Sequence, residues 1–301
     1  MLRLFTGSLI LWSALVLGQG TPSTLLWRVT GPGAAGPSYL YGTIHSRDDR
    51  AFQFGDSVLP ALDRCRVVAG ELDLDHAVKD LAGLMTHMTL PGDQRLLDLY
   101  RPKDRKVVEK ALSDRFGPMA SMLQRMKPFY VMALLSEGDA GEGRERMLDD
   151  HLMERGRTNG QRVIGLETME EQLNAMDAIP VKDQAAMLLD HVKRSSDGRQ
   201  LDDMLNAYAA QDLDKLYAAM GDGEEIPEAL VKALFTDRNE RMAHRLDSLI
   251  RSGETVFFLM GAGHLPREMG LVALLRTRGY QVEPVFSVAH RREEEPAPAR
   301  D

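Results

Sequence analysis

An uninterrupted apolar run near the end of the chain, VFFLM at 256–260, constrains the fold more than any other feature. A strand that is apolar on both faces must be covered on both sides, as in sheets flanked by helices. Other short runs predict strands at both ends of the chain and once in its middle, at 24–29, 38–44, 66–72, 161–167 and 280–287. We expect an α/β (α+β) protein with a central mixed β-sheet built from both ends of the chain.

The sequence between these strands is helical in pattern. Apolar residues recur at helical spacing from about 76 to 160 and again from 168 to 251. Pro118 and Pro128 each stand where a helix begins, because proline is tolerated in the first helical turn. The pattern predicts a helical lobe over about 76–250, inserted into a domain that spans 21–289.

The two ends of the chain differ in character from this domain. The first 20 residues carry one cation, Arg3, then an apolar run, then small residues, which is the pattern of a secretory signal peptide. An uncleaved N-terminal anchor is the alternative. We expect an exported protein, periplasmic or secreted, with no stable membrane span in the mature chain. The charged, proline-rich segment 290–301 predicts a disordered tail.

The net charge restricts the partners that the chain can bind, and the cysteine count restricts its disulfides. The chain of 301 residues has a formal net charge of −8 and no basic tract, which argues against nucleic acid as a partner. Cys65 is the only cysteine, so an internal disulfide is excluded and folding depends on burial.

Four predicted strands end in residues that can carry chemistry. Two apolar strands are each followed by Gly-x-x-His, which ends in His45 near the start of the chain and in His264 near its end. Two more strands end in carboxylates, Glu71 and Glu167. Functional groups of open α/β sheets gather beyond the carboxyl ends of the strands. One such histidine is commonly a hydrogen-bonded core residue, but four strand ends together favour a site.

This residue set supports two mechanisms. Two imidazoles with one or two carboxylates are a recurrent ligand set for a catalytic divalent metal that keeps a position for water. Such a metal lowers the pKa of its bound water to about 7. The same residues can act without metal if one histidine is a general base oriented by a glutamate. The sequence leaves both open.

Three further residues are candidates for this site. Glu167 directly precedes a predicted capping box, Thr168 with Glu171, which leaves Glu167 itself free to point into a cleft. Arg238 and Asn239 fall on the apolar stripe of a predicted helix. Either that helix begins near the surface and one of its first residues caps it, or both side chains line the cleft.

The chain resembles the TraB/GumN family, whose animal relatives are the TIKI proteins. The resemblance covers about 25–289 and is carried by LYGTIH, GELDLD, GLETMEEQL, DRNERMA and MGAGHLPREMGLVALLRTRGYQVEPV. It departs from the family at Arg267, where glycine is frequent. The layout is also similar to that of the erythromycin esterase-like and haem-uptake ChaN-like proteins.

The resemblance implies a metal-dependent, peptidase-like site with Mn, Co or Zn as the divalent metal. His45, Glu71 and His264 would be the metal ligands, with Glu71 as third ligand or general base. Glu167, Arg238 and Asn239 would lie around them, and Arg238 or Asn239 would steady the developing oxyanion.

We therefore expect an exported metal-dependent hydrolase that acts on a peptide or another carbonyl substrate. Two alternatives remain open. One is a metal-free, esterase-like hydrolase. The other is a non-catalytic protein that binds or sequesters a peptide or a small ligand, such as a pheromone or haem, in the same cleft.

Overall fold

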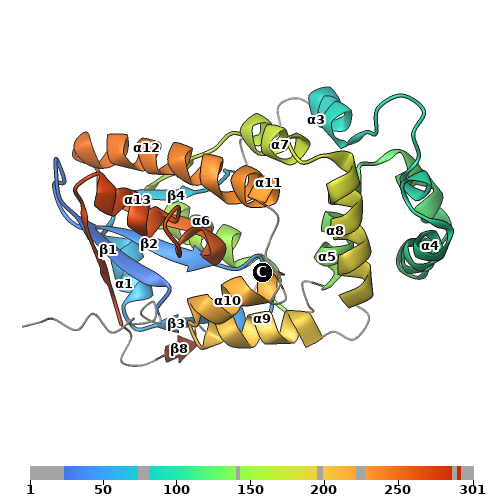
Figure 1. Ribbon diagram of the computed structural model, residues 1–301. Coiled ribbons are helices and arrows are strands. Elements are labelled where there is room, and N and C mark those ends of the chain that lie inside the picture. Colours follow the sequence, from blue (N-terminus) through green and yellow to red (C-terminus); the bar gives the residue numbers. More distant parts are fainter. Residues whose placement is uncertain are drawn as a thin grey trace, which may run out of the picture.

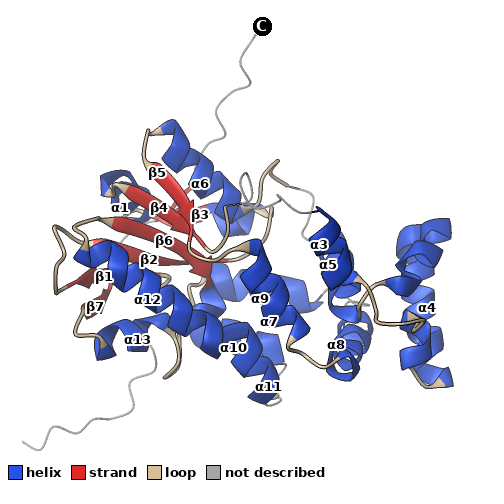
Figure 2. Ribbon diagram, turned by 90° about the horizontal axis from the view of Figure 1, so that it is seen from above, coloured by secondary structure: helices blue, strands red, loops and turns tan. Residues whose placement is uncertain are grey.

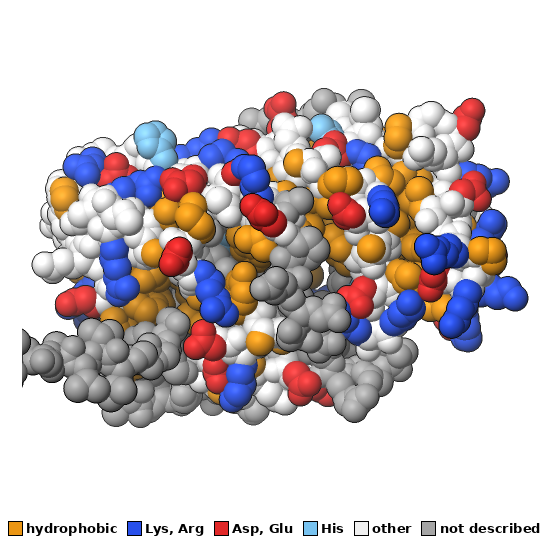
Figure 3. Space-filling model, viewed as in Figure 1, with side chains coloured by type: hydrophobic (Ala, Val, Ile, Leu, Met, Phe, Trp, Pro, Cys, Tyr) orange, Lys and Arg blue, Asp and Glu red, His pale blue; other side chains and the backbone are white. Residues whose placement is uncertain are grey.

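The computed structural model describes residues 24–73, 81–139, 143–194, 199–221, 228–286 and 290–292. The expected signal segment, 1–20, and the end of the expected tail lie outside these ranges. A central sheet with helices on both faces forms one part of the molecule, and a helical lobe extends from it (Figure 1). Acidic and basic side chains are interspersed over the face shown in Figure 3.

The central sheet has six strands in the order β5-β4-β6-β2-β1-β7. Their bounds are β1 Leu26–Thr30, β2 Ser38–Thr43, β4 Val67–Gly70, β5 Arg162–Gly165, β6 Val256–Gly261 and β7 Gln281–Pro284. The first four in this order are parallel to one another, and β1 is antiparallel to both β2 and β7. The prediction of a mixed sheet built from both ends of the chain and the short run near 165 is confirmed, and the structure places that run, β5, at the edge.

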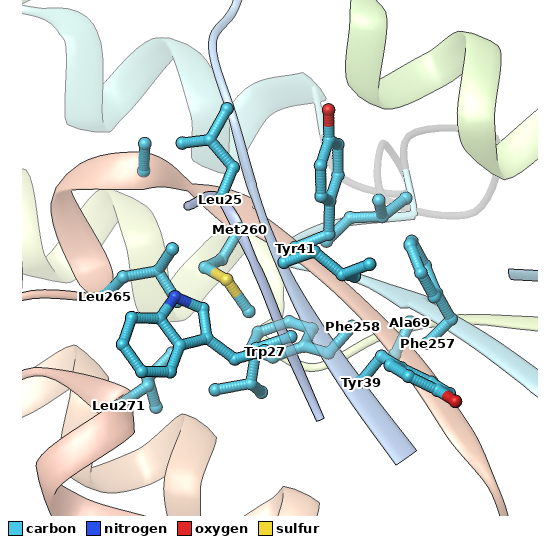
Figure 4. Packing of buried hydrophobic residues seen from close by; sticks show 14 of the residues in the cluster. Leu25, Trp27, Tyr39, Tyr41, Ala69, Phe257, Phe258, Met260, Leu265 and Leu271 are labelled. Atoms are coloured by element: carbon cyan, nitrogen blue, oxygen red, sulfur yellow. The ribbon is translucent and has the colours of Figure 1, made fainter. Parts of the chain in front are cut away.

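Strand β6 lies at the centre of the core, as its sequence predicts. Its first five residues are fully buried, and it pairs in parallel with β2 on one side and β4 on the other. Phe257 and Phe258 point to opposite faces and pack among Trp27, Tyr39 and Leu265 (Figure 4). Burying each phenylalanine contributes roughly 1.5–3 kcal/mol, which makes this strand a main source of stability.

Helices cover both faces of the sheet. One face carries α1 (Val58–Arg64) and α6 (Leu148–Thr158), and the other carries α12 (Asp237–Arg251) and α13 (Leu271–Thr277) (Figure 2). Close packing of α6 depends on Gly156, because a Cβ there would lie 2.8 Å from Cγ2 of Val68. The layers explain why β4 and β6, in the middle of the sheet, are apolar along their length.

The helical lobe lies to one side of the sheet and has cores of its own (Figure 1). It comprises α3 (Leu81–Met88), α4 (Pro102–Phe116), α5 (Pro128–Asp139), α7 (Met169–Asp177) and α8 (Val181–Arg194), with 3₁₀ helices at Leu96–Leu99 and Gly117–Arg125. Pro118 lies in the first turn of the second 3₁₀ helix and Pro128 begins α5, as predicted. Helices α9 (Arg199–Ala209) and α10 (Leu213–Gly221) return the chain to the sheet, where the hydroxyl of Tyr208 donates to the carbonyl of Gly42 at 2.9 Å.

A second sheet of two short strands was not predicted. Strand β3 (Gln53–Gly55), which follows a 3₁₀ helix at Asp49–Phe52, pairs antiparallel with β8 (His290–Arg292). The first residues of the segment expected to be a disordered tail from 290 therefore form a strand. Each strand has three residues, too few for a period of two to be visible in sequence.

Among the described residues, no helix combines the length and the apolar character needed to cross a membrane.

Candidate functional site

Four neighbouring parallel strands end at the same edge of the sheet. In the order β5, β4, β6 and β2, the residues that follow these strands include Glu167, Glu71, His264 and His45. Neighbouring strands lie about 4.8 Å apart, so the four side chains start along an edge of roughly 15 Å. Pairing of Thr43 with Gly261 at the end of β2 and β6 brings the two Gly-x-x-His motifs side by side.

The glycines of the two motifs serve different purposes. A Cβ on Gly42 would lie 2.7 Å from Cδ1 of Leu265 and 3.1 Å from Cα of Ala262, so the loop of the second motif packs directly on the first. Gly261 instead donates its backbone N–H to Oε1 of Glu71 at 2.8 Å. One glycine therefore permits close approach, and the other orients a carboxylate.

His264 is held in one tautomer by Asn239. Nδ1 of His264 lies 2.5 Å from Oδ1 of Asn239, whose Nδ2 donates to the carbonyl of Met269 at 2.7 Å. Because the amide nitrogen of Asn239 is committed to that carbonyl, its oxygen accepts and the proton lies on Nδ1 of His264. Nε2 of His264 is then an unprotonated acceptor, and it faces Oε1 of Glu71 at 3.6 Å.

Burial and charge set opposite protonation states at neighbouring groups. Burial lowers the pKa of His264 to about 4, so this imidazole is neutral at neutral pH. Burial raises the pKa of Glu71, but His264, Arg238, His45 and the N–H of Gly261 outweigh it and hold the pKa at about 2. Glu71 is therefore ionised beside a neutral acceptor.

Arg238 joins the two carboxylates of the site. Its Nη2 donates to Oε2 of Glu71 at 2.5 Å and to Oε2 of Glu167 at 2.6 Å, and its Nε donates to Glu167 at 2.9 Å. The Glu167 side chain is 0% exposed and also accepts from Arg241 at 3.2 Å. Glu167 therefore does not point into an open cleft. It is a buried anion that positions Arg238, which in turn positions Glu71.

The helix that carries Arg238 and Asn239 does not begin at these residues. Helix α11 (Glu228–Val231), a π-helical turn (Lys232–Thr236) and α12 follow one another without a break. Arg238 and Asn239 are buried on the same stripe as Met242. The alternative of a surface helix start, with one of them as a cap, is wrong, and both side chains lie in the site. Adjacent to them, the ring of Phe235 in the π turn lies 5.2 Å from that of His264.

The predicted capping box beside Glu167 is confirmed. Thr168 accepts from the backbone N–H of Glu171, and the Glu171 carboxylate accepts from the backbone N–H of Thr168. Arg245 of α12 donates to both carboxylate oxygens of Glu171 at 2.7 and 2.6 Å. The box thus also ties α7 to the helix that carries the site residues.

His45 is turned toward a residue that the sequence did not single out. Its Nδ1 lies 3.0 Å from Oδ2 of Asp149 in the first turn of α6, and Thr43 donates to the other oxygen of Asp149. Asp149 raises the pKa of His45, and Glu71 adds to the effect. The His45 side chain is 64% exposed, so the imidazole is open to solvent. Asp149 is one of several acids near the start of α6, and only the docking of α6 on the sheet distinguishes it.

A divalent metal between Glu71 and His264 fits the donor set that these two residues present. Two acceptors without a proton between them face each other at 3.6 Å, and the second nitrogen of the imidazole is anchored, as is usual for a metal-bound histidine. His45, the third predicted ligand, is paired with Asp149. No group of three or more His, Cys, Asp and Glu side chains arranged for a metal occurs within the described ranges.

Comparison with known proteins places the chain in a family. The TraB/PrgY/gumN family matches residues 25–284, which include all six predicted site residues. The chain belongs to this TraB/PrgY/gumN family. The expected family resemblance is thereby confirmed. No solved structure matches the chain.

Several curated relatives are named metalloproteases. Metalloprotease TIKI2 of Danio rerio is 26% identical over 321 residues, covering 89% of this chain and 62% of the relative. A Metalloprotease TIKI homolog of Amphimedon queenslandica is 26% identical over 318 residues, covering 88% and 62%. Metalloprotease TIKI1 of Homo sapiens is 23% identical over 303 residues, covering 82% and 59%. The chain thus spans about three fifths of the length of these relatives.

Arg267, in the loop that follows His264, has a backbone φ of +73°. Glycine adopts this left-handed region freely, whereas other residues do so rarely. Arg267 adopts that conformation, and His264, which precedes it in the loop, contacts Asn239 and Glu71.

Proposed function

We propose that this protein is a metal-dependent hydrolase that cleaves a peptide or a related carbonyl substrate at the edge of its sheet. The observation that carries the proposal is the pair formed by Nε2 of His264 and Oε1 of Glu71, two acceptors 3.6 Å apart. The names of the metalloprotease relatives support the same class of reaction.

The residues of the site have separate roles in this proposal. Glu71 and His264 would hold the metal, which when bound would polarise a water molecule or the carbonyl of the substrate. Asn239 keeps the proton of His264 on Nδ1, so that Nε2 stays available. Arg238 holds Glu71 in place and in its ionised form. These bonds occupy Arg238 and Asn239, so we assign them to positioning rather than to the oxyanion.

His45 has the properties of a proton donor. Asp149 orients its ring and raises its pKa, and the exposed ring can reach a bound substrate. In peptide hydrolysis the bond between carbonyl carbon and amide nitrogen breaks, and the leaving nitrogen needs a proton. We assign that proton to the His45 imidazolium, which recovers one from the attacking water.

The test combines metal content with cleavage. We expect about one divalent metal ion per wild-type chain by elemental analysis, and cleavage of members of a quenched fluorescent peptide library. His264→Ala and Glu71→Gln should lose both. His244→Ala is the matched control, because this histidine is exposed on α12, and it should keep both. Equal metal content in all four proteins contradicts the proposal.

The metal-free mechanism has one observation in its favour, the oriented pair of His45 and Asp149. If it operates, cleavage survives chelation and is lost in His45→Ala and in Asp149→Ala. A purely binding protein would instead hold a peptide at one-to-one stoichiometry after chelation and release no product.

Export belongs to the proposal as well. We infer that the chain is secreted or periplasmic, because of the signal-like pattern at 1–20. Fractionation of expressing cells, with N-terminal sequencing of the mature chain, tests it. Recovery of the uncut chain in the cytoplasm contradicts it.

A further inference from the structure

The loop that follows His264 holds an arginine in a strained backbone conformation. Arg267 lies between the short 3₁₀ helix Ala262–His264 and α13, and its φ is +73°. Among the described residues other than glycine, only Gln211 shares a positive φ. Left-handed conformations at residues other than glycine are unfavourable and concentrate at ligand-binding sites. The strain indicates that the Arg267 side chain has a use that glycine could not serve.

The guanidinium of Arg267 is connected to the site by a row of rings. It stacks on the ring of Tyr217 in α10, 4.6 Å from the centroid. The Tyr217 ring lies 6.4 Å from that of Phe235, and the Phe235 ring lies 5.2 Å from that of His264. The cation is therefore separated from the proposed metal-binding imidazole by two aromatic side chains.

Within the part of the chain that the structure describes, the guanidinium of Arg267 is available to bind a ligand. Its side chain is exposed and forms no ion pair or hydrogen bond with any described residue. Other arginines are each paired with an acid. In α12, Arg245 pairs with Glu171 and Arg251 with Asp247, and at the end of α13 Arg278 pairs with Glu240. A planar guanidinium fixed on an aromatic ring is suited to bind a carboxylate with two parallel hydrogen bonds.

We propose that Arg267 determines specificity by binding a carboxylate of the substrate, from an aspartate or glutamate side chain. The distances along the row of rings limit the separation between the guanidinium and the His264 ring to about 16 Å, and an extended peptide advances about 3.3 Å per residue, so that acid lies within about five residues of the bond that is cleaved. The inference rests on the proposed hydrolase site, because it uses that site to define where the substrate lies.

The experiment compares peptides that differ only in charge. Fluorescein-labelled peptides carry either Glu or Gln at one position, scanned along the chain, and their binding is measured by anisotropy. Wild type should bind the best Glu peptide roughly fivefold more tightly than its Gln partner, the upper range for a solvent-exposed ion pair. Arg267→Gln should abolish this ratio. Arg101→Gln, which removes an exposed arginine at the start of α4, should retain it.

Binding and cleavage together distinguish this inference from the proposed function. Cleavage by wild type without a preference for Glu overturns the role of Arg267 and leaves the hydrolase proposal standing. A preference for Glu that Arg267→Gln loses, without cleavage of any peptide, supports Arg267 and contradicts the hydrolase. Absence of binding, or an equal preference in both proteins, overturns the inference. Arg267→Gly is the second variant, because it removes the charge and relieves the backbone strain.

Discussion

Replacing Arg238 with methionine removes the guanidinium that bridges two buried carboxylates. Glu167 would keep the hydrogen bond from Arg241, and Glu71 would keep the N–H of Gly261. Three charge-assisted hydrogen bonds to the two carboxylates are lost, together with one to the carbonyl of Leu234. Removing one partner of a buried ion pair costs about 3–5 kcal/mol. Because both carboxylates retain other donors, we expect a loss of about 3 kcal/mol in the free energy of unfolding.

Urea unfolding followed by circular dichroism measures this loss at neutral pH. The pKa of Glu71 is lowered in the folded protein to about 2, against an ordinary value of 4.5, so its ionised form stabilises the fold above pH 4.5. The difference between wild type and Arg238→Met should therefore shrink as the pH falls from about 4.5 toward 2. Arg278→Met, which breaks an exposed pair with Glu240, should cost less than about 1 kcal/mol. Equal losses for the two variants would refute the buried-bridge account.

Three further outcomes follow from other contacts. Gly42→Ala should lower stability by about 1–3 kcal/mol in urea unfolding, because its methyl group would overlap Leu265; an unchanged midpoint contradicts this packing. Asp149→Asn should lower the pKa of His45 in metal-free protein, followed by proton NMR of the ring; an unshifted titration argues against their pairing. The pKa of Glu171 is lowered to about 2, chiefly by its hydrogen bonds with an arginine of α12. Its contribution, about 1–2 kcal/mol after allowance for its partial exposure, is present above pH 4.5 and lost toward pH 2, so Glu171→Gln should destabilise only above that window.

The parallel strands of the central sheet were predictable because each contains a short apolar run. A run such as 256–260 has no polar face, so it can only be a strand or helix covered on both sides, and its length and neighbouring glycines decide for a strand. The position of the four strand ends was predictable for another reason: the carboxyl ends of neighbouring parallel strands meet at one edge of the sheet. The two strands of the small second sheet carry no such pattern and pair only through the fold.

The side-chain contacts of the site were less predictable. Helical periodicity put Arg238 and Asn239 on the inward face, but it did not reveal that a π turn connects their helix directly to α11. The partnership of His45 and Asp149 joins residues that are far apart in sequence, and it depends on how α6 docks. The sequence left Glu167 free to point into a cleft, and its burial follows from the arginines of α12, which the local sequence around β5 does not show.

Nitrogen NMR of the His264 ring shows whether Nε2 is free to bind a metal. In metal-free protein we expect a neutral ring with its proton on Nδ1, and a large change of the Nε2 resonance when Zn²⁺ is added. The same addition to Glu71→Gln should produce a much smaller change. A proton on Nε2 in the metal-free protein, or a resonance that ignores the metal, would contradict the account.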